Sequence, residues 1–137
     1  MHIHGGNIYK ASQIYGIKAE DILDYSTNIN PLEICGEYFK KTTGWLKEEK
    51  ERFYRELSNI KGLKVFEPQT NFILIKILLP SLDAGTLKDR MGKKGILIRD
   101  ASNFRFLNDK FFRIAIKDRK SNIIFQSLLK EVMESAG

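Results

Sequence analysis

The sequence predicts an α+β fold in which one sheet of mostly antiparallel strands carries helices packed on one face. Helix-like and strand-like segments follow in the order helix, strand, strand, helix, strand, strand, helix. The 137 residues are one domain's worth of chain, and 42% apolar with 29% charged residues is typical of a soluble globular protein. With the helices on one side of the sheet, no helix is left to cover the other.

The first part of the chain predicts short helices followed by a loop. Apolar residues recur at helical spacing over residues 8–15 and the pattern stops at Gly16. Residues 19–23 predict another turn or so of helix. Residues 24–32 are polar, rich in asparagine and contain a proline, which is typical of an extended loop.

A long helix is predicted from Glu37 to Ile60, with its apolar residues on one stripe and lysine and glutamate around the rest. Gly44 predicts a kink or break within it. Gly62 ends the helix. A brief strand is expected over residues 63–66, and a longer, almost continuously apolar strand, central in the sheet, over residues 72–79. Ala84, Leu87 and Met91 form one face of a further helix. Ile124, Leu128 and Val132, with Phe125 and Leu129 beside them, indicate a last amphipathic helix.

Between these helices, two strand-like runs over residues 96–98 and 111–116 carry arginines. Arg99 ends the first run, and Arg113 stands in the middle of the second, on the face opposite Phe112. An uncompensated buried guanidinium costs several kcal/mol, so Arg113 either faces solvent or points at an anion. Its planar fork suits a carboxylate or a phosphate held by two parallel hydrogen bonds.

Composition narrows the class of function. No run approaches the roughly 18 apolar residues of a membrane helix, the first residues do not form a signal peptide, and a single cysteine, Cys35, excludes an intrachain disulfide. A cytoplasmic protein is therefore expected. The net charge of +6 favours anionic ligands, but the lysines are spread among glutamates, so nucleic acid is not the expected partner. His2 and His4 lack further ligands nearby, so no metal site is predicted.

Several motifs resemble those of one family of fold-type I pyridoxal-phosphate enzymes, the threonine-phosphate decarboxylases and histidinol-phosphate aminotransferases. Segments 4–9 and 24–32 resemble the N-terminal part of the decarboxylases, which belong to cobalamin biosynthesis. The chain from about Glu37 onward resembles the C-terminal small domain of both enzymes, through residues 50–54, 68–72, 95–100 and 112–114. The resemblance implies an N-terminal arm with a short helix over residues 1–34, and a sandwich-like small α+β domain with its long linking helix over residues 35–137.

The same resemblance implies that the large cofactor domain is absent. In the family, Asn-Pro-Leu leads into that domain, whereas here Leu32 passes to Glu37 within five residues, with Cys35 at the join. No Ser-x-Ser-Lys-like segment supplies a Schiff-base lysine, and no aspartate or aromatic residue is placed to hold the cofactor ring. No catalytic residue and no bound pyridoxal phosphate are therefore expected in this chain, which looks like a truncated member, inactive alone.

Substrate contacts of the family fall on residues that are present. His4 and Gly5 match the arm that closes on the substrate phosphate, and Asn28 matches an asparagine near the substrate. Arg99 and Arg113, fourteen residues apart, match the arginines that grip phosphate and carboxylate. The resemblance thus implies weak binding of a phosphorylated, amino-acid-like small molecule.

Two alternatives stand beside the inactive remnant: a fragment that completes an enzyme with a separately encoded large domain, and a basic module that binds nucleic acid. The uncovered sheet face also predicts self-association. Residues 1–34 are expected to be loosely held or repacked. One departure from the family is Phe106-Leu107, where Gly-Leu is usual.

Overall fold

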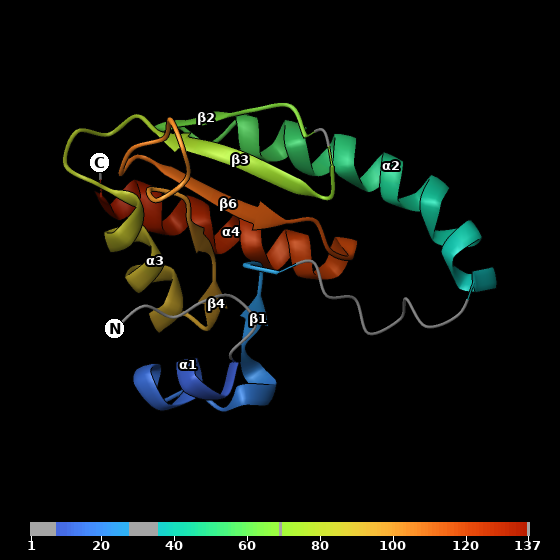
Figure 1. Cartoon of the computed structure of the whole chain (residues 1–137), viewed down its shortest axis with the longest axis horizontal. Coiled ribbons are helices and arrows are strands. Elements are labelled where there is room, and N and C mark those ends of the chain that lie inside the picture. The colour runs from blue at the N-terminus through green and yellow to red at the C-terminus, as the bar shows by residue number, and fades with distance from the viewer. Residues whose placement is uncertain (1–7, 28–35, 69, 137) are drawn as a thin grey trace.

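The computed structural model describes residues 8–27, 36–68 and 70–136. Figure 1 shows the elements in chain order. They are α1 (Ile8–Tyr15), the 3-10 helix η1 (Ala19–Asp21), β1 (Leu23–Asp24), α2 (Gly36–Ser58), β2 (Leu63–Val65), β3 (Phe72–Ile77), α3 (Ala84–Lys93), β4 (Ile96–Leu97), β5 (Arg99–Asp100), β6 (Phe111–Ala115) and α4 (Arg119–Ala136).

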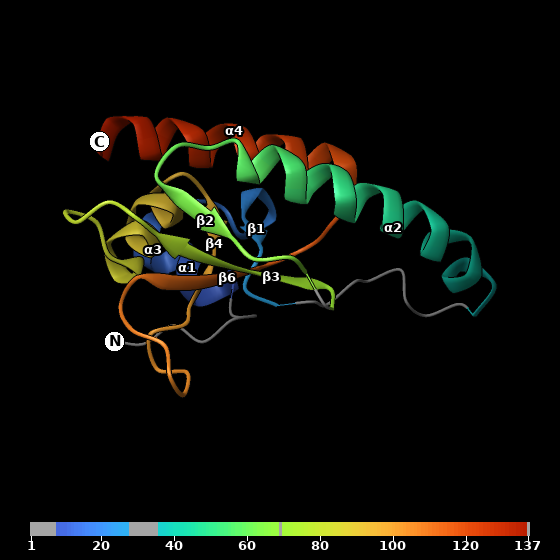
Figure 2. The same ribbon diagram turned by 90° about the horizontal axis from the view of Figure 1, so that it is seen from above.

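The main sheet has four strands in the order β2-β3-β6-β5, and every neighbouring pair is antiparallel. Figure 2 shows α2 and α4 along one side of this sheet and the loop between β5 and β6 on the other. The predicted α+β class, with helices packed on one face of an antiparallel sheet, is confirmed.

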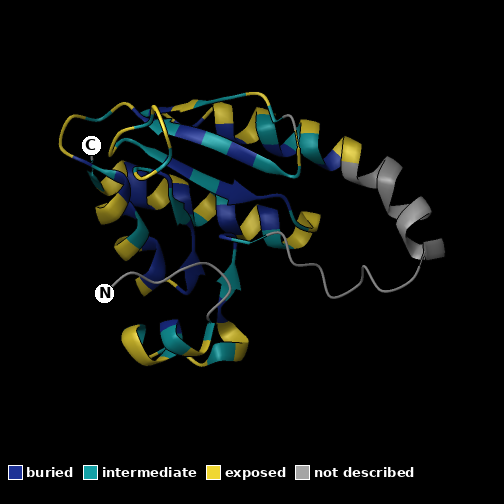
Figure 3. Ribbon diagram, in the orientation of Figure 1, coloured by how far each residue is buried: buried dark blue, intermediate teal, exposed yellow. Residues whose placement is uncertain are grey.

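Strict alternation along the two central strands builds the core. Ile73, Ile75 and Ile77 of β3 are buried, as are Phe112 and Ile114 of β6. Figure 3 colours the ribbon by burial and marks buried stretches on the central strands and on the helices beside them. These side chains share one cluster with buried residues of the helices, among them Phe53 and Leu57 of α2 and Phe125 and Leu129 of α4. Each fully buried side chain of this size stabilises the fold by about 1.5–3 kcal/mol.

The segment from Ile96 to Asp100 changes sheets part-way. Ile96 and Leu97 pair in parallel with Leu23 and Asp24 in a separate two-stranded sheet. Arg99 and Asp100 then pair with β6 in the main sheet. The sequence predicted one strand over residues 96–98 with Arg99 at its end, and it predicted no strand at residue 24. The structure corrects both points. Ile96–Leu97 forms a strand with Leu23–Asp24, and Arg99–Asp100 forms a separate strand with β6.

Leu23–Ser26 is more firmly placed than expected of a loosely held arm. The Tyr25 side chain is 0% exposed and lies among core rings, with centroids 4.4 Å from Phe125 and 6.4 Å from Phe53. Its hydroxyl donates a hydrogen bond of 2.8 Å to Asn122 Oδ1. At these residues the packing agrees with a repacked segment rather than a loosely held one. The predicted domain boundary between residues 34 and 35 lies outside the described residues.

The long helix also differs from the prediction in two respects, its continuity and its end. α2 runs through Gly44 without a break, since one glycine costs a helix interior only about 1 kcal/mol. It ends at Ser58, and the chain turns at Gly62, whose φ of 91° is a conformation that glycine adopts readily.

Candidate functional site

Arg99 and Arg113 lie directly opposite each other on neighbouring strands. The register of β5 and β6 pairs these two residues, so their side chains leave the same face of the sheet. Residues opposite each other in an antiparallel pair have Cβ atoms about 4.5–5.5 Å apart, and like charges at that spacing destabilise the pair. We call this two-residue feature the arginine pair. It lies on the face away from α2 and α4, which we call the open face.

The Nε donors of the arginine pair have no acceptor among the described residues. Nε of Arg99 and Nε of Arg113 are also both buried. Burial lowers the pKa of Arg113, and the neighbouring charge of Arg99 lowers it further. A buried donor without an acceptor is destabilising. Here two such donors lie side by side, and each belongs to a positively charged group. An anion bound between the two guanidinium groups would supply acceptors for these donors and offset the repulsion between the two positive charges.

Aromatic rings hold these guanidinium groups from the sides. The Cζ atom of Arg113 lies 4.0 Å from the Phe72 ring centroid, and the Cζ atoms of both arginines lie 5.4 Å from the Phe104 centroid. A ring face attracts a guanidinium without using its N–H donors. The donors therefore remain available to a phosphate or carboxylate, while the rings fix the position of the charges.

The carboxylate that follows Arg99 in the sequence points away from the arginine pair. Asp100 follows Arg99 but stands opposite the buried Phe112, so its side chain belongs to the helix-covered face. Its Oδ1 accepts a 2.9 Å hydrogen bond from the backbone N–H of Ser102. Its charge also acts on Lys88 of α3, where it raises the pKa while burial, the larger effect, lowers it. Asp100 thus leaves the open face positively charged.

The loop between β5 and β6 carries Phe104 to the arginine pair. Lys110 fastens its far end, since Nζ donates to the carbonyl oxygens of Leu79, Pro80 and Leu82 at 3.0, 3.2 and 2.7 Å. At the tip, Phe106 is 91% exposed and has a φ of 71°, which favours glycine. The residue that departs from the family's Gly-Leu pattern therefore adopts a backbone conformation suited to that glycine.

Of the predicted site residues, the structure brings Arg99 and Arg113 together. His4, Gly5 and Asn28 lie outside the described residues. In the described ranges, no group of three or more metal-ligating side chains gathers, and no helix has both the length and the apolarity needed to cross a membrane. A hollow of about 490 Å³ between α1 and η1 is lined by Ile8, Tyr9, Lys18, Ala19 and Glu20, and includes none of the residues around the arginine pair.

Sequence reasoning missed the two rings, Phe72 and Phe104. Alternation along β3 could have placed Phe72 on the face of Leu74 and Lys76, opposite the buried isoleucines. The contact of Phe72 with Arg113 depends on the register between β3 and β6, and the position of Phe104 depends on a loop conformation. Neither is encoded in local spacing.

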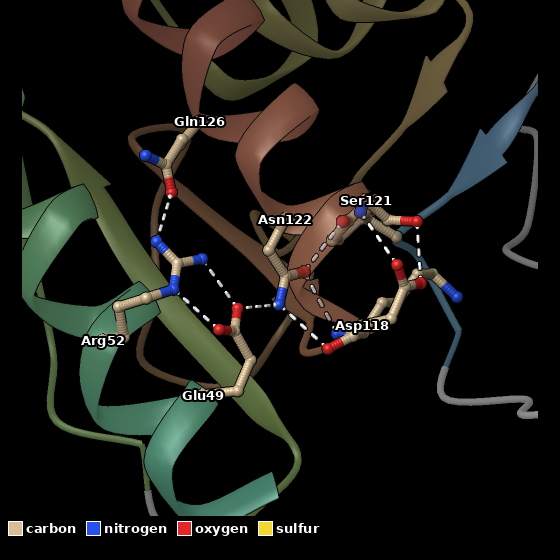
Figure 4. Close-up of polar contacts among 8 residues, drawn as sticks. Glu49, Arg52, Asp118, Ser121, Asn122 and Gln126 are labelled. Atoms are coloured by element: carbon tan, nitrogen blue, oxygen red, sulfur yellow. Dashed lines mark hydrogen bonds and ion pairs between the residues drawn. The ribbon is translucent and has the colours of Figure 1, made fainter. Parts of the chain in front are cut away.

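A polar cluster between α2 and α4 was also missed, and its contacts identify it as structural. Glu49 is 3% exposed and accepts hydrogen bonds from Arg52 Nε at 2.6 Å, from Arg52 Nη2 at 2.7 Å and from Asn122 Nδ2 at 2.7 Å (Figure 4). Arg52 Nη1 donates to Gln126 Oε1 at 3.2 Å. Because this buried carboxylate has its donors in place, the cluster joins the two helices and offers nothing to a ligand.

Comparison with known proteins gives the family. The family model for aminotransferase class I and II matches residues 21–125. The chain belongs to this family. A protein of Caldanaerobacter subterraneus subsp. tengcongensis named as a threonine-phosphate decarboxylase is 41% identical over 98 residues, which cover 72% of this chain and 26% of that protein. The resemblance inferred from the motifs is confirmed.

Solved structures support the same family. The histidinol-phosphate aminotransferase of Clostridium acetobutylicum matches with a TM-score of 0.67 and 37% identity, over 72% of this chain and 29% of that one. The L-threonine-O-3-phosphate decarboxylase of Porphyromonas gingivalis matches with a TM-score of 0.62 and 29% identity, over 66% and 28%. The chain therefore spans between about a quarter and a third of the lengths of these aminotransferase-family relatives.

The described residues around the arginine pair fit an anion, but they do not fit the ring of pyridoxal phosphate, the cofactor of this family. A pyridine nitrogen needs a carboxylate on the same face, and Asp100 is turned to the other face. Lys76 shares the open face, but its Nζ lies 5.7 Å over the Phe111 ring, two residues along β3 from the position opposite Arg113. Two guanidinium groups side by side on one face have the charge and the donor chemistry to bind a phosphate or a carboxylate.

Proposed function

We propose that this chain is a truncated, threonine-phosphate decarboxylase-like member of its family that binds a substrate anion and is inactive alone. The arginine pair supports the proposal, because its two buried Nε donors have no acceptor in the described ranges and its charges lie against Phe72 and Phe104. The ligand class is a phosphorylated, amino-acid-like molecule, whose phosphate or carboxylate accepts from both guanidinium groups. The resemblance to the decarboxylases supports a place in cobalamin biosynthesis.

Inactivity follows from the groups that the reaction needs. Pyridoxal phosphate supplies the electron sink for decarboxylation and transamination in this family. In the family the cofactor domain follows Asn-Pro-Leu, and here only four residues separate Leu32 from Glu37. Tyr25, which precedes Leu32, is buried in the same core cluster as residues of the elements after Glu37. The segment with Tyr25 and those later elements therefore pack together.

A second candidate is a fragment that becomes active with a separately encoded large domain. The open face favours this candidate, because α2 and α4 lie on the other side of the sheet and a second chain could contribute the remaining residues of a shared site. Co-expression with a large-domain fragment of the family tests this candidate. Decarboxylation of O-phospho-L-threonine that needs both chains would support it, whereas no activity in the mixture supports the inactive remnant.

Calorimetric titration tests the main proposal. O-phospho-L-threonine, inorganic phosphate and L-threonine are added in turn to the wild type, Arg99→Met, Arg113→Met and the control Arg90→Met, an exposed arginine of α3. A few charge-assisted hydrogen bonds offset by ligand immobilisation give a Kd of about 1 mM for the phosphorylated ligand. Each pair variant should weaken this binding about tenfold or more, and Arg90→Met should not.

Two results would contradict the proposal. One is binding of the phosphorylated ligand that is unchanged in Arg113→Met. The other is turnover of O-phospho-L-threonine by the chain alone with added pyridoxal phosphate, especially turnover that survives Arg113→Ala.

A further inference from the structure

The open face carries a second set of cations and rings beside the arginine pair. Strand register places Lys64 of β2 opposite Lys76 of β3, and Lys76 opposite Phe111 of β6. These three residues form a row across the sheet, and Phe66, which follows β2, stacks on Phe111 with ring centroids 6.2 Å apart and planes 23° apart. We call Lys64, Phe66, Lys76 and Phe111 the lysine row.

The lysine row repeats the chemistry of the arginine pair. Lys64 Nζ lies 5.3 Å from the Phe66 ring centroid, and Lys76 Nζ lies 5.7 Å from the Phe111 centroid. Arg113 of β6 stands opposite Leu74 of β3, and Lys76 lies two residues further along β3. Arg113 and Lys76 therefore belong to neighbouring rows of the sheet. Alternate residues of a strand are about 7 Å apart. Cations and half-buried rings thus recur across the sheet and along it.

A small phosphorylated substrate needs only the arginine pair, so the lysine row is left without a role in the proposed function. Cations interleaved with aromatic faces are the chemistry that binds single-stranded nucleic acid: the cations track the phosphates and unpaired bases stack on the rings. A four-stranded antiparallel sheet with helices on one face is a platform that such proteins use. The net charge of +6 adds attraction for a polyanion.

We infer that the open face binds single-stranded nucleic acid, with phosphates at the arginine pair and the two lysines and bases stacked on Phe66 and Phe111. The inference goes beyond the proposed function and shares only the arginine pair with it. The sequence prediction against nucleic acid rested on lysines dispersed among glutamates along the chain. Strand pairing gathers some of these cations on one face, which the sequence order does not reveal.

Fluorescence anisotropy with labelled twelve-nucleotide oligo(U) and oligo(dT), and with a duplex of equal length, tests the inference. Both single strands should bind more tightly than the duplex, since paired bases hide their faces. The double variant Phe66→Leu/Phe111→Leu should weaken single-strand binding roughly tenfold or more. Tyr9→Leu, which removes an exposed aromatic ring from α1, is the matched control and should have no effect. Lys64→Gln should lower the salt dependence of binding by about 0.7 in the log–log slope, and Lys130→Gln on the surface of α4 should not.

Shift mapping on the wild type keeps the test independent of variant folding. Unlabelled oligo(U) should shift amide signals of β2, β3 and β6 and leave the outer side of α4 unchanged. Equal affinity for duplex and single strands, shifts confined to the helices, or a dimer that buries the open face and excludes the oligonucleotide would overturn the inference. Calorimetry with O-phospho-L-threonine on Phe66→Leu/Phe111→Leu separates the two proposals, because that binding should persist when oligonucleotide binding is lost.

Discussion

The two faces of the sheet satisfy their polar groups in different ways. On the helix-covered face, Glu49 receives donors from Arg52 and Asn122, and Asn122 in turn accepts from Tyr25. On the open face, Arg99 and Arg113 stand side by side with buried Nε atoms that find no acceptor in the described part of the chain.

This difference separates a charge that the fold satisfies from charges that it leaves without Nε acceptors in the described ranges. A buried charge whose partners are all supplied by the fold contributes to packing and orientation, and removing one partner is destabilising. A pair of like charges without acceptors opposes folding and persists where binding compensates for it.

The largest effect should come from two neighbouring phenylalanines of β6. Phe112→Ala removes a 0% exposed core side chain and should lower the free energy of unfolding by about 3–5 kcal/mol. Phe111→Ala, on the open face, should lower it by less than about 1 kcal/mol. Urea denaturation of both variants measures the difference, and equal losses would mean that the open face is packed as a core.

Asn122→Ala should be the next most destabilising change. It leaves the Tyr25 hydroxyl without its acceptor and takes one donor from the buried Glu49 carboxylate, which together lower stability by about 2–3 kcal/mol. Tyr25→Phe, which removes only one of these hydrogen bonds, is the control and should lose about 1 kcal/mol. An Asn122→Ala variant as stable as the wild type in urea denaturation would show that the cluster is not structural.

Alkaline pH should weaken the covered face through Tyr25. Burial, followed by the charges of Asp118 and Glu49, raises the pKa of Tyr25 above its ordinary value. The folded state therefore holds this proton more tightly than the unfolded state, so its contribution is complete below pH 10 and declines as the pH rises further. Relative to Tyr25→Phe, the wild type should lose up to about 1.4 kcal/mol per pH unit above 10. Parallel denaturation curves of the two proteins between pH 8 and 11 check this, and a constant difference would contradict it.

Arg113→Met should stabilise the fold while removing anion binding. Relief of the charge repulsion and of an unsatisfied buried donor should raise stability by about 1 kcal/mol in the absence of ligand. Arg90→Met, an exposed change, should leave stability within about 0.5 kcal/mol of the wild type. A destabilised Arg113→Met measured in phosphate-free buffer would show that the arginine is held by the fold rather than for a ligand.

The smallest effect concerns the loop that carries Phe104. Phe106→Gly should stabilise the protein by up to about 1 kcal/mol, because a φ of 71° strains a phenylalanine but not a glycine. Phe106→Ala keeps the strain and should give no gain. Thermal unfolding of the two variants makes the comparison, and equal melting temperatures would locate the strain elsewhere.

Local spacing was sufficient to predict much of this fold and part of the site. Alternation over residues 111–116 correctly put Arg113 on the face away from the helices, and helical stripes predicted α2 and α4. These features depend on residues a few positions apart, which a sequence displays directly.

Long-range pairing decided what could not be predicted. The sequence over residues 96–98 looks like one strand. Leu97, however, pairs with β1, more than seventy residues away in the sequence, and Arg99 pairs with β6, about fourteen residues away. The burial of Tyr25 likewise depends on Asn122 and Phe125 near the other end of the chain. Such contacts follow from topology and register, and no local pattern specifies them.

The central claim is that register builds one anion site from two arginines. Phosphate titration followed by NMR at the Nε–Hε groups of Arg99 and Arg113 tests it most directly, with chloride at equal ionic strength as the control. Both signals should shift toward saturation together, with one shared Kd of about 1 mM. Saturation at only one arginine, or linear shifts that chloride reproduces, would contradict the claim.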